Sequence, residues 1–158
     1  MANRKIGNAV VDIDVEATRA FYSLVKPRNA CDCAGCRNFR KWAENSPPAV
    51  GEFLREIGID DLCYASVSPC GAGREKYAQD RRIFYTGFYH VVGRKIDGGE
   101  GRFAMAGGST MLTEAFSVTL NEGPLLDAPV GLPGPILQIG FQALIPWLLD
   151  ETNIYVYD

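Results

Sequence analysis

Apolar residues recur at helical spacing over the first third of the chain, most clearly between residues 46 and 59. Ser46 is the expected N-cap of a helix here, Pro47 suits its first position, and Gly58 supplies the left-handed residue that commonly ends a helix. One apolar stripe at i, i+3, i+4 and i+7 is predicted to be its buried face. That stripe consists of Val50, Phe53, Leu54 and Ile57.

Two shorter helices are expected before this one. The first is capped by Asp14 and stops before Pro27. Its apolar face is predicted to consist of Ala17, Ala20, Phe21 and Leu24. The second begins near Asp32 or Cys33. Its buried face is predicted to consist of Cys36, Phe39 and Ala43, with Trp42 beside them. The helical part of the chain is therefore expected over about residues 14–58.

The apolar period shortens from about 3.6 residues to about 2 after Asp61, which predicts strands. The strongest strand covers residues 82–95, where both faces are apolar or aromatic. Such a strand belongs in the middle of a sheet with both sides covered. The last residues, 153–158, are expected to form an edge strand or an ordered tail. The five main strands predicted are Leu62–Val67, Arg82–Lys95, a return through Phe103 and Met105, Thr110–Asn121 and Ile136–Phe141.

This order of elements predicts an α+β fold, because helices precede strands instead of alternating with them. We expect the N-terminal helices to pack on one face of a five-stranded, mostly antiparallel meander sheet. Residues 1–158 are predicted to be a single domain, with its sheet part over about residues 62–143. Residues 123–135 contain four prolines and three glycines, which predicts a long irregular loop.

Composition places the chain among globular proteins, with 47% hydrophobic and 22% charged residues. A net charge of -3 argues against broad neutralisation of nucleic-acid phosphates. The longest purely apolar run, Ala143–Leu149, is too short to span a bilayer, and no secretory signal is apparent. We therefore expect a cytoplasmic protein without a membrane or nucleic-acid partner. The sequence identifies no other partner and leaves a homo-oligomer open.

Three of the five cysteines, Cys31, Cys33 and Cys36, lie within six residues. An odd number of cysteines with this spacing differs from the paired framework of a small secreted protein. A Cys-x-x-Cys pair with a third thiolate nearby is a candidate zinc site, which needs a fourth ligand. The candidates for that fourth ligand are Cys63, Cys70 and the single histidine, His90.

Two other interpretations of the cluster stay open. In a redox interpretation, Cys33 lies near a helix N-terminus that lowers its pKa, and Cys36 is the resolving thiol. In a packing interpretation, Cys36 is a small buried residue and the others are loop thiols. His90 is a candidate base for thiol chemistry, although its position among apolar strand residues favours a hydrogen-bonded interior histidine.

Several stretches resemble a group of small uncharacterised bacterial proteins of unknown function that carry a Cys-x-Cys-x-x-Cys-Arg-Asn-Phe motif. The similarity extends from about Asp14 to Glu151. It implies an autonomous domain and carries over no catalytic residue. The residues that bear it are Cys31-Asp32-Cys33, Cys36-Arg37-Asn38-Phe39, Leu54, Ile57-Gly58-Ile59-Asp60, Gly87-Phe88-Tyr89-His90-Val91-Val92-Gly93, Leu137-Gln138 and Pro146-Trp147-Leu148-Leu149.

Two functional hypotheses follow. The first is a non-enzymatic binding or accessory domain in which the cysteine cluster holds a structural zinc ion. The second is a thiol-dependent enzyme or redox protein that uses Cys33 and Cys36, with His90 as a candidate base. A bound metal without a labile water favours the first hypothesis, and a reactive Cys33 of low pKa favours the second.

Overall fold

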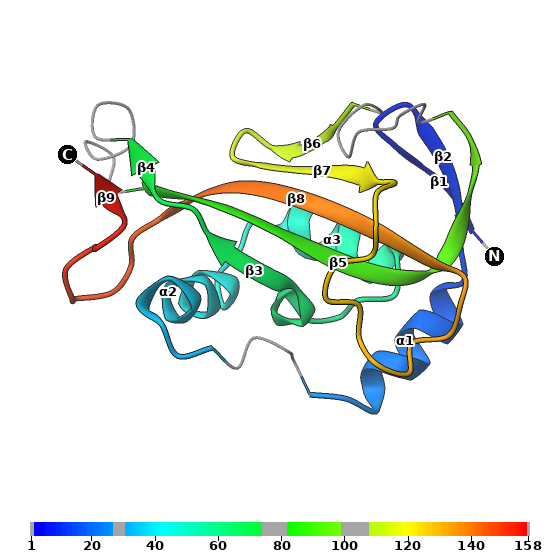
Figure 1. The fold of residues 1–158 in the computed structure, drawn as a ribbon, viewed down its shortest axis with the longest axis horizontal. Helices are drawn as coiled ribbons and strands as arrows, with labels where there is room; N and C mark the ends of the chain where they lie inside the picture. Colours follow the sequence, from blue (N-terminus) through cyan, green and yellow to red (C-terminus); the bar gives the residue numbers. More distant parts are fainter. Residues whose placement is uncertain (1, 27–30, 74–81, 99–107, 158) are drawn as a thin grey trace.

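The computed structural model describes residues 2–26, 31–73, 82–98 and 108–157 (Figure 1). The α-helices are α1 (Val15–Ser23), α2 (Ala34–Ala43) and α3 (Pro48–Glu56), with a 3₁₀ turn η1 (Leu62–Tyr64). The strands are β1 (Ala2–Ile6), β2 (Ala9–Ile13), β3 (Ser66–Pro69), β4 (Ala72–Gly73), β5 (Arg82–Asp97), β6 (Thr110–Thr113), β7 (Phe116–Asn121), β8 (Ile136–Pro146) and β9 (Val156–Tyr157).

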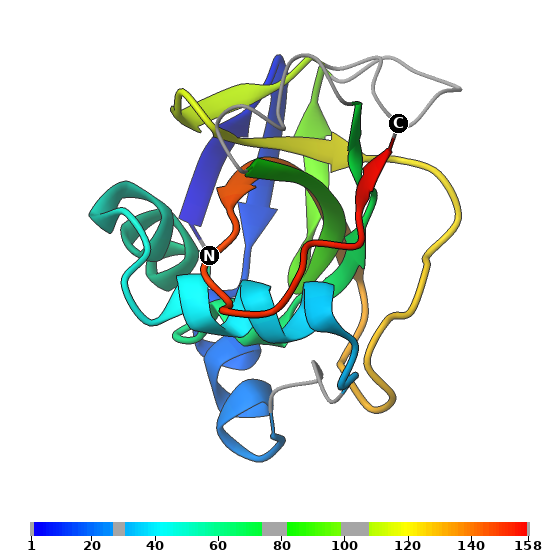
Figure 2. The same cartoon turned by 90° about the vertical axis from the view of Figure 1, so that its left-hand side faces the viewer.

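Seven of these strands form one antiparallel sheet, in the order β1-β2-β5-β8-β7-β6, with β3 also paired to β5. The longest ladder joins β5 to β8, from Arg82 opposite Pro146 to Val92 opposite Ile136. The sheet curls strongly when viewed from its end (Figure 2). The two edges of the sheet come together, because the amide of Gly7, in the turn after β1, donates to Thr110 Oγ1 of β6 at 2.8 Å.

In the view of Figure 1, α1 and α2 lie below the long β5–β8 ladder and α3 lies behind it, and all three contribute residues to the buried core. Phe39 of α2 packs its ring against Tyr85 and Phe141, with centroid separations of 5.6 and 5.9 Å. Tyr85 belongs to β5 and Phe141 to β8, so α2 covers the centre of the sheet. One cluster of buried apolar residues extends from Ile6 to Trp147, and the helices and the sheet share it.

The α+β class is confirmed, whereas two details of the predicted sheet are wrong. The sheet has seven strands instead of five, because the hairpin β1–β2 precedes the helices. It is also not a meander, since β5 lies between β2 and β8. The hairpin turns at Gly7, which has a φ of 61°, and the buried apolar residues of β2 are Ala9, Val11 and Ile13 at alternate positions. Three alternating apolar residues were too few to predict a strand from the sequence.

Helix α1 begins at the predicted cap, but it buries a different face from the one predicted. Asp14 accepts a hydrogen bond from the amide of Ala17, as an N-cap does. Thr18 and Tyr22 are buried, while Leu24 is 86% exposed. The Tyr22 hydroxyl donates to the carbonyl of His90 at 2.6 Å, so a polar contact with β5 sets the helix orientation.

Helix α3 bears out the predicted stripe, since all four of its residues are buried. It begins one residue later than expected, with Pro47 as the N-cap in place of Ser46. Its end follows the prediction: Gly58 has a φ of 97°, and the amide of Ile59 bonds back to the carbonyl of Leu54 at 2.8 Å.

Three of the other predicted strands differ in their limits. The segment 62–67 starts as η1 and becomes a strand only at Ser66. The segment 110–121 is a hairpin, β6–β7, instead of one strand. Strand β8 extends five residues beyond the predicted end, to Pro146. The predicted return through residues 103–105 lies outside the described residues.

The other long-range expectations agree better with the structure. Strand β5 covers the predicted segment 82–95 and has neighbours on both edges. Helix α2 packs on the face of β5 that bears Tyr85, and Phe84 and Phe88 on the other face are half-buried. Residues 123–135 form the irregular connection that was expected. The C-terminal strand β9 pairs in parallel with β4, apart from the main sheet.

We predict that Phe53→Ala lowers the free energy of unfolding by about 3–5 kcal/mol, because it empties a buried aromatic site under α3. Chemical denaturation measures the change. Leu24→Ala, at the exposed C-cap of α1, is the control and should change stability by less than about 0.5 kcal/mol. A loss below about 1 kcal/mol for Phe53→Ala would contradict the packing of α3.

Candidate metal centre

The three clustered cysteines lie together at the start of α2. Cys33 is the N-cap residue, and its Sγ accepts a hydrogen bond from the amide of Cys36 at 3.4 Å. The sulfur atoms of Cys31, Cys33 and Cys36 all lie within 4.8 Å of one another. Exposure falls along the cluster, because Cys31 is exposed, Cys33 half-buried and Cys36 buried. The cluster therefore faces solvent on one side and the core on the other.

A buried polar network fixes α2 against the sheet and so fixes the cluster. The Tyr85 hydroxyl donates to the carbonyl of Gly35 at 2.6 Å. Asn38, which is fully buried, donates to the Tyr85 hydroxyl and to the carbonyl of Pro146, at 3.3 and 3.1 Å. Its side-chain oxygen accepts the amide of Leu148 at 2.7 Å. Asn38 thus uses both ends of its amide to join α2 to the end of β8.

The sulfur of Cys33 accepts several hydrogen bonds. Burial alone would raise the pKa of this thiol. Hydrogen bonds from the Cys36 amide and from the Cys31, Tyr155 and Cys36 side chains outweigh burial and lower the pKa to about 7. Cys36 shows the opposite shift, since burial and its hydrogen bonds to the neighbouring thiols raise its pKa to about 12. Of these two thiols, Cys33 therefore loses its proton at the lower pH.

Two arginines of α2 lie beside the cluster. The Arg40 guanidinium donates to the carbonyl of Cys31 at 2.8 Å and holds the exposed end of the cluster. Asp32 makes ion pairs with Arg37 and Arg40 at 3.7 and 3.8 Å. These cations partly offset the negative charge that thiolates bring to the site.

The structure does not bring Cys70 or His90 to the cluster. Side chains alternate along β5, so Thr86 and His90 point away from the face on which Tyr85 contacts α2. Cys70 Sγ lies 3.4 Å from Thr86 Oγ1, on that opposite face. His90 is buried, and its Nε2 lies 2.9 Å from Gln138 Oε1, also on the opposite face.

Cys63 lies on the same side of the sheet as α2. It belongs to η1, where the carbonyl of its neighbour Leu62 accepts the hydroxyl of Tyr89 at 2.9 Å. Burial and the nearby carboxylate of Asp61 raise the pKa of the Cys63 thiol to about 11, and the charge of Arg40 acts in the other direction. Within the described ranges, the group of metal-binding side chains consists of the three clustered cysteines, without Cys63.

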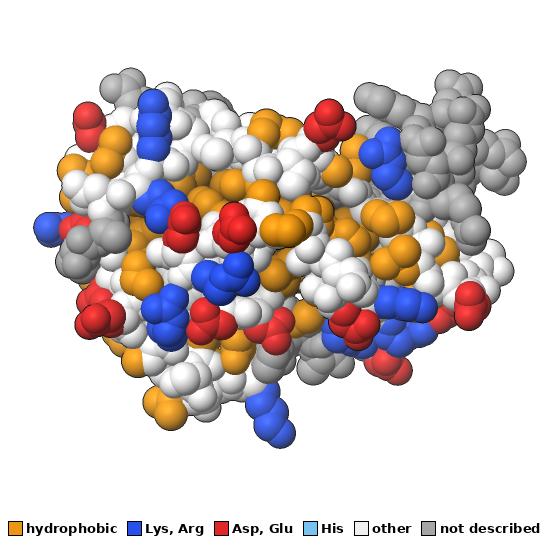
Figure 3. Space-filling view, turned by 180° about the vertical axis from the view of Figure 1, so that it is seen from behind, with side chains coloured by type: hydrophobic (Ala, Val, Ile, Leu, Met, Phe, Trp, Pro, Cys, Tyr) orange, Lys and Arg blue, Asp and Glu red, His pale blue; other side chains and the backbone are white. Residues whose placement is uncertain are grey.

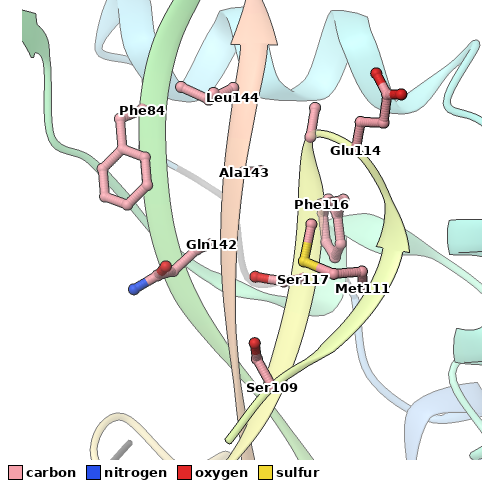
Figure 4. A pocket seen from close by; sticks show the side chains of 10 residues that line it. Phe84, Ser109, Met111, Glu114, Phe116, Ser117, Gln142, Ala143 and Leu144 are labelled. Carbon is pink, nitrogen blue, oxygen red and sulfur yellow. The ribbon is translucent and has the colours of Figure 1, made fainter.

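A shallow hollow lies on the face of the sheet opposite the cysteine cluster (Figure 4). The sequence did not predict it. The hollow encloses about 270 Å³. Its described lining combines apolar and neutral polar side chains with one carboxylate, Glu114. This lining offers contacts to a ligand but no group of titratable side chains. The side chains around it include Phe84, Met111, Ser117, Gln142 and Leu144.

On the face seen in Figure 3, basic and acidic side chains are intermingled, which agrees with the small net charge. A scan of protein-family models found no match for this chain, and searches of curated proteins and of solved structures also found none. In the described part of the chain, no helix has the length and apolar character needed to cross a membrane.

Sequence reasoning located the three thiols but missed two residues that position them. Asn38 occurs within the quoted motif, and a polar residue between Cys36 and Phe39 on a buried face is a signal that could have identified it. Tyr155 is 120 residues away from Gly35, which its hydroxyl contacts, and no local pattern marks it.

We predict that Asn38→Ala lowers the free energy of unfolding by about 2–4 kcal/mol, because it leaves the Pro146 carbonyl and the Leu148 amide without their partner. Chemical denaturation measures the loss. Asn45→Ala, at an exposed position after α2, is the matched control and should be nearly neutral. Equal effects of the two substitutions would contradict the role of Asn38.

Proposed function

We propose that Cys31, Cys33 and Cys36 hold a structural zinc ion in a non-enzymatic binding or accessory domain. The observation that carries the proposal is the mutual approach of the three sulfurs to within 4.8 Å. Zinc–sulfur bonds of about 2.3 Å in a tetrahedron imply sulfur–sulfur distances of about 3.8 Å. Small side-chain rotations suffice to reach that geometry from the observed cluster.

Three thiolates around one divalent ion carry a net negative charge, and the guanidinium groups of Arg37 and Arg40, which also pair with Asp32, lie beside them. Zinc must displace the proton of Cys36, whose pKa is raised to about 12 in the metal-free site. The affinity for zinc is therefore expected to increase with pH. Of the three fourth-ligand candidates, Cys63 is favoured because it shares the helical side of the sheet with the cluster.

We also propose that the protein acts in a reducing compartment such as the cytoplasm. All five cysteines are free, and in such a compartment thiols stay available to a metal.

The first test is elemental analysis of protein purified without chelator and without added metal. We expect about one zinc ion per chain, lost in the double variant Cys33→Ser/Cys36→Ser together with part of the thermal stability. The domain should remain folded after metal removal, because its apolar core forms without the cluster. Circular dichroism checks the fold and the unfolding temperature.

Cys70→Ser is the matched control for the double variant, since Cys70 lies on the opposite face of the sheet. It should retain zinc. Loss of zinc in Cys63→Ser alone would identify Cys63 as the fourth ligand. Wild-type protein that contains no metal, and takes up none on addition of zinc, would rule out the proposal.

The arrangement of Cys33 and Cys36 favours a second candidate function, thiol–disulfide exchange. The Cys33 thiolate would attack the disulfide of a partner, and the Cys36 thiol would then lose its proton and displace that partner. The partner leaves as a dithiol while Cys33 and Cys36 form a disulfide. The single histidine of the chain lies on the opposite face of the sheet, so the base in this candidate is not His90.

Alkylation kinetics of metal-free protein test this candidate. Because folding lowers the pKa of Cys33 to about 7, its thiolate is present from neutral pH upwards and is lost as the pH falls through that value. At pH 7 we expect a reactive thiol that is modified about ten times faster than a cysteine in an unstructured peptide. Cys33→Ser should remove this fast phase. Slow modification of every thiol at pH 7 would exclude the redox candidate.

A further inference from the structure

The C-terminal segment of the chain crosses in front of α2 (Figure 2). Strand β9 holds its far end by pairing in parallel with β4, Ala72 opposite Val156 and Gly73 opposite Tyr157. Trp147 holds its near end, since its Nε1 donates to the carbonyl of Glu151 at 2.8 Å. Residues far from the cluster in sequence are thereby brought to its surface.

An ion pair joins this segment to α2 one residue beyond the cluster. The guanidinium of Arg37 binds the carboxylate of Glu151 through both of its terminal nitrogens, with Nη2 at 3.1 Å from Oε2. This two-pronged geometry fixes orientation better than a single contact does. The ion pair thus helps to fix the position of the C-terminal segment relative to the first turn of α2.

Tyr155 lies at the point where the segment passes the cluster. Its hydroxyl accepts a hydrogen bond from the amide of Gly35 at 3.2 Å. A phenolic hydroxyl that accepts one bond still has a proton to donate, and the Tyr155 hydroxyl is within hydrogen-bonding reach of the sulfur of Cys33. The ring packs against Trp147, with centroids 6.2 Å apart. Both the ring and the hydroxyl are therefore held in place.

Gly35 explains how the hydroxyl comes so close to the helix. A Cβ atom at this position would lie 2.9 Å from the Tyr155 oxygen and 2.4 Å from Cγ of Pro69. The helix turn that carries the cluster is therefore enclosed between β3 and the C-terminal segment. A larger side chain at position 35 would push Tyr155 away from the sulfurs.

We propose that Tyr155 is a positioning residue of the metal centre, which holds the sulfur of Cys33 through its hydroxyl and covers one side of the cluster. This inference rests on the proposed zinc site. A hydrogen bond to a ligand atom fixes the direction of its lone pairs and stabilises the charge on the thiolate, and such outer contacts support metal affinity. The hydroxyl reaches Cys33 together with the helix amide of Cys36, so the sulfur is oriented from two directions.

The test measures zinc affinity by competition with a chelator of known affinity. Tyr155→Phe keeps the ring and removes the hydroxyl, and we expect it to weaken zinc binding by about 10–100-fold. Tyr64→Phe is the matched control, because it also removes a hydroxyl with two hydrogen bonds, here to the carbonyls of Tyr22 and Val25. It should leave zinc affinity within about twofold of wild type while lowering stability to a similar extent.

Cobalt substitution supplies a readout that a general loss of stability would not change. We expect the thiolate-to-cobalt absorption band to shift in Tyr155→Phe and to stay unchanged in Tyr64→Phe. Should Tyr155→Phe fail to fold, the test uses Glu151→Gln, because it weakens the ion pair that holds the same segment and leaves Tyr155 and the three cysteines unchanged. A severalfold loss of affinity is then expected.

The outcomes separate this inference from the proposal on which it rests. Wild-type protein that binds no zinc would overturn both. Wild-type protein that binds zinc, with Tyr155→Phe equal to Tyr64→Phe in affinity and in cobalt spectrum, would overturn only the role of Tyr155.

Discussion

The contact between Tyr85 and the first two turns of α2 determines where the cysteine cluster lies. A tyrosine hydroxyl on the central strand β5 donates to Gly35 and accepts from Asn38, and Asn38 in turn holds the chain just beyond β8. Burial of these polar groups is tolerated because each has a partner. The network gives α2 a single position on the sheet, which apolar packing of Phe39 alone would specify less strictly.

Once α2 is held, two amides in its first turn find hydrogen-bond acceptors outside the helix. The first turn of a helix has amide groups without partners inside the helix. Here the sulfur of Cys33 accepts one of them, and the hydroxyl of Tyr155 accepts another. A metal that replaced the protons of Cys31 and Cys36 would leave both of these contacts intact. The protein environment thus suits a thiolate at Cys33 whether a proton or a metal ion occupies the rest of the cluster.

The parts of this architecture that sequence could predict are those that depend on neighbouring residues. The stripe and the glycine end of α3, the cap of α1 and the position of the thiols at a helix start all depend on spacings of a few residues. The hairpin β1–β2 was missed because its pattern is short, and its place in the sheet depends on β5, some eighty residues later. Asn38 and Tyr155 act through partners more than a hundred residues away, at Leu148 and Gly35, and such pairings leave no periodic trace in the sequence.

The structure places His90 and the cysteine cluster on opposite faces of the central strand, a separation that the sequence did not indicate. His90 is buried as a hydrogen-bonded interior residue, as its apolar strand neighbours suggested. Gln138 donates to the carbonyl of Pro124, so its Oε1 is the acceptor for the amide of Leu126 and for the Nε2–H of His90. This histidine therefore helps to attach the loop over residues 123–135 to the outer face. The cysteine cluster lies on the opposite face of the sheet from His90. Thiol or metal chemistry at the cluster must therefore use residues on the face that carries α2.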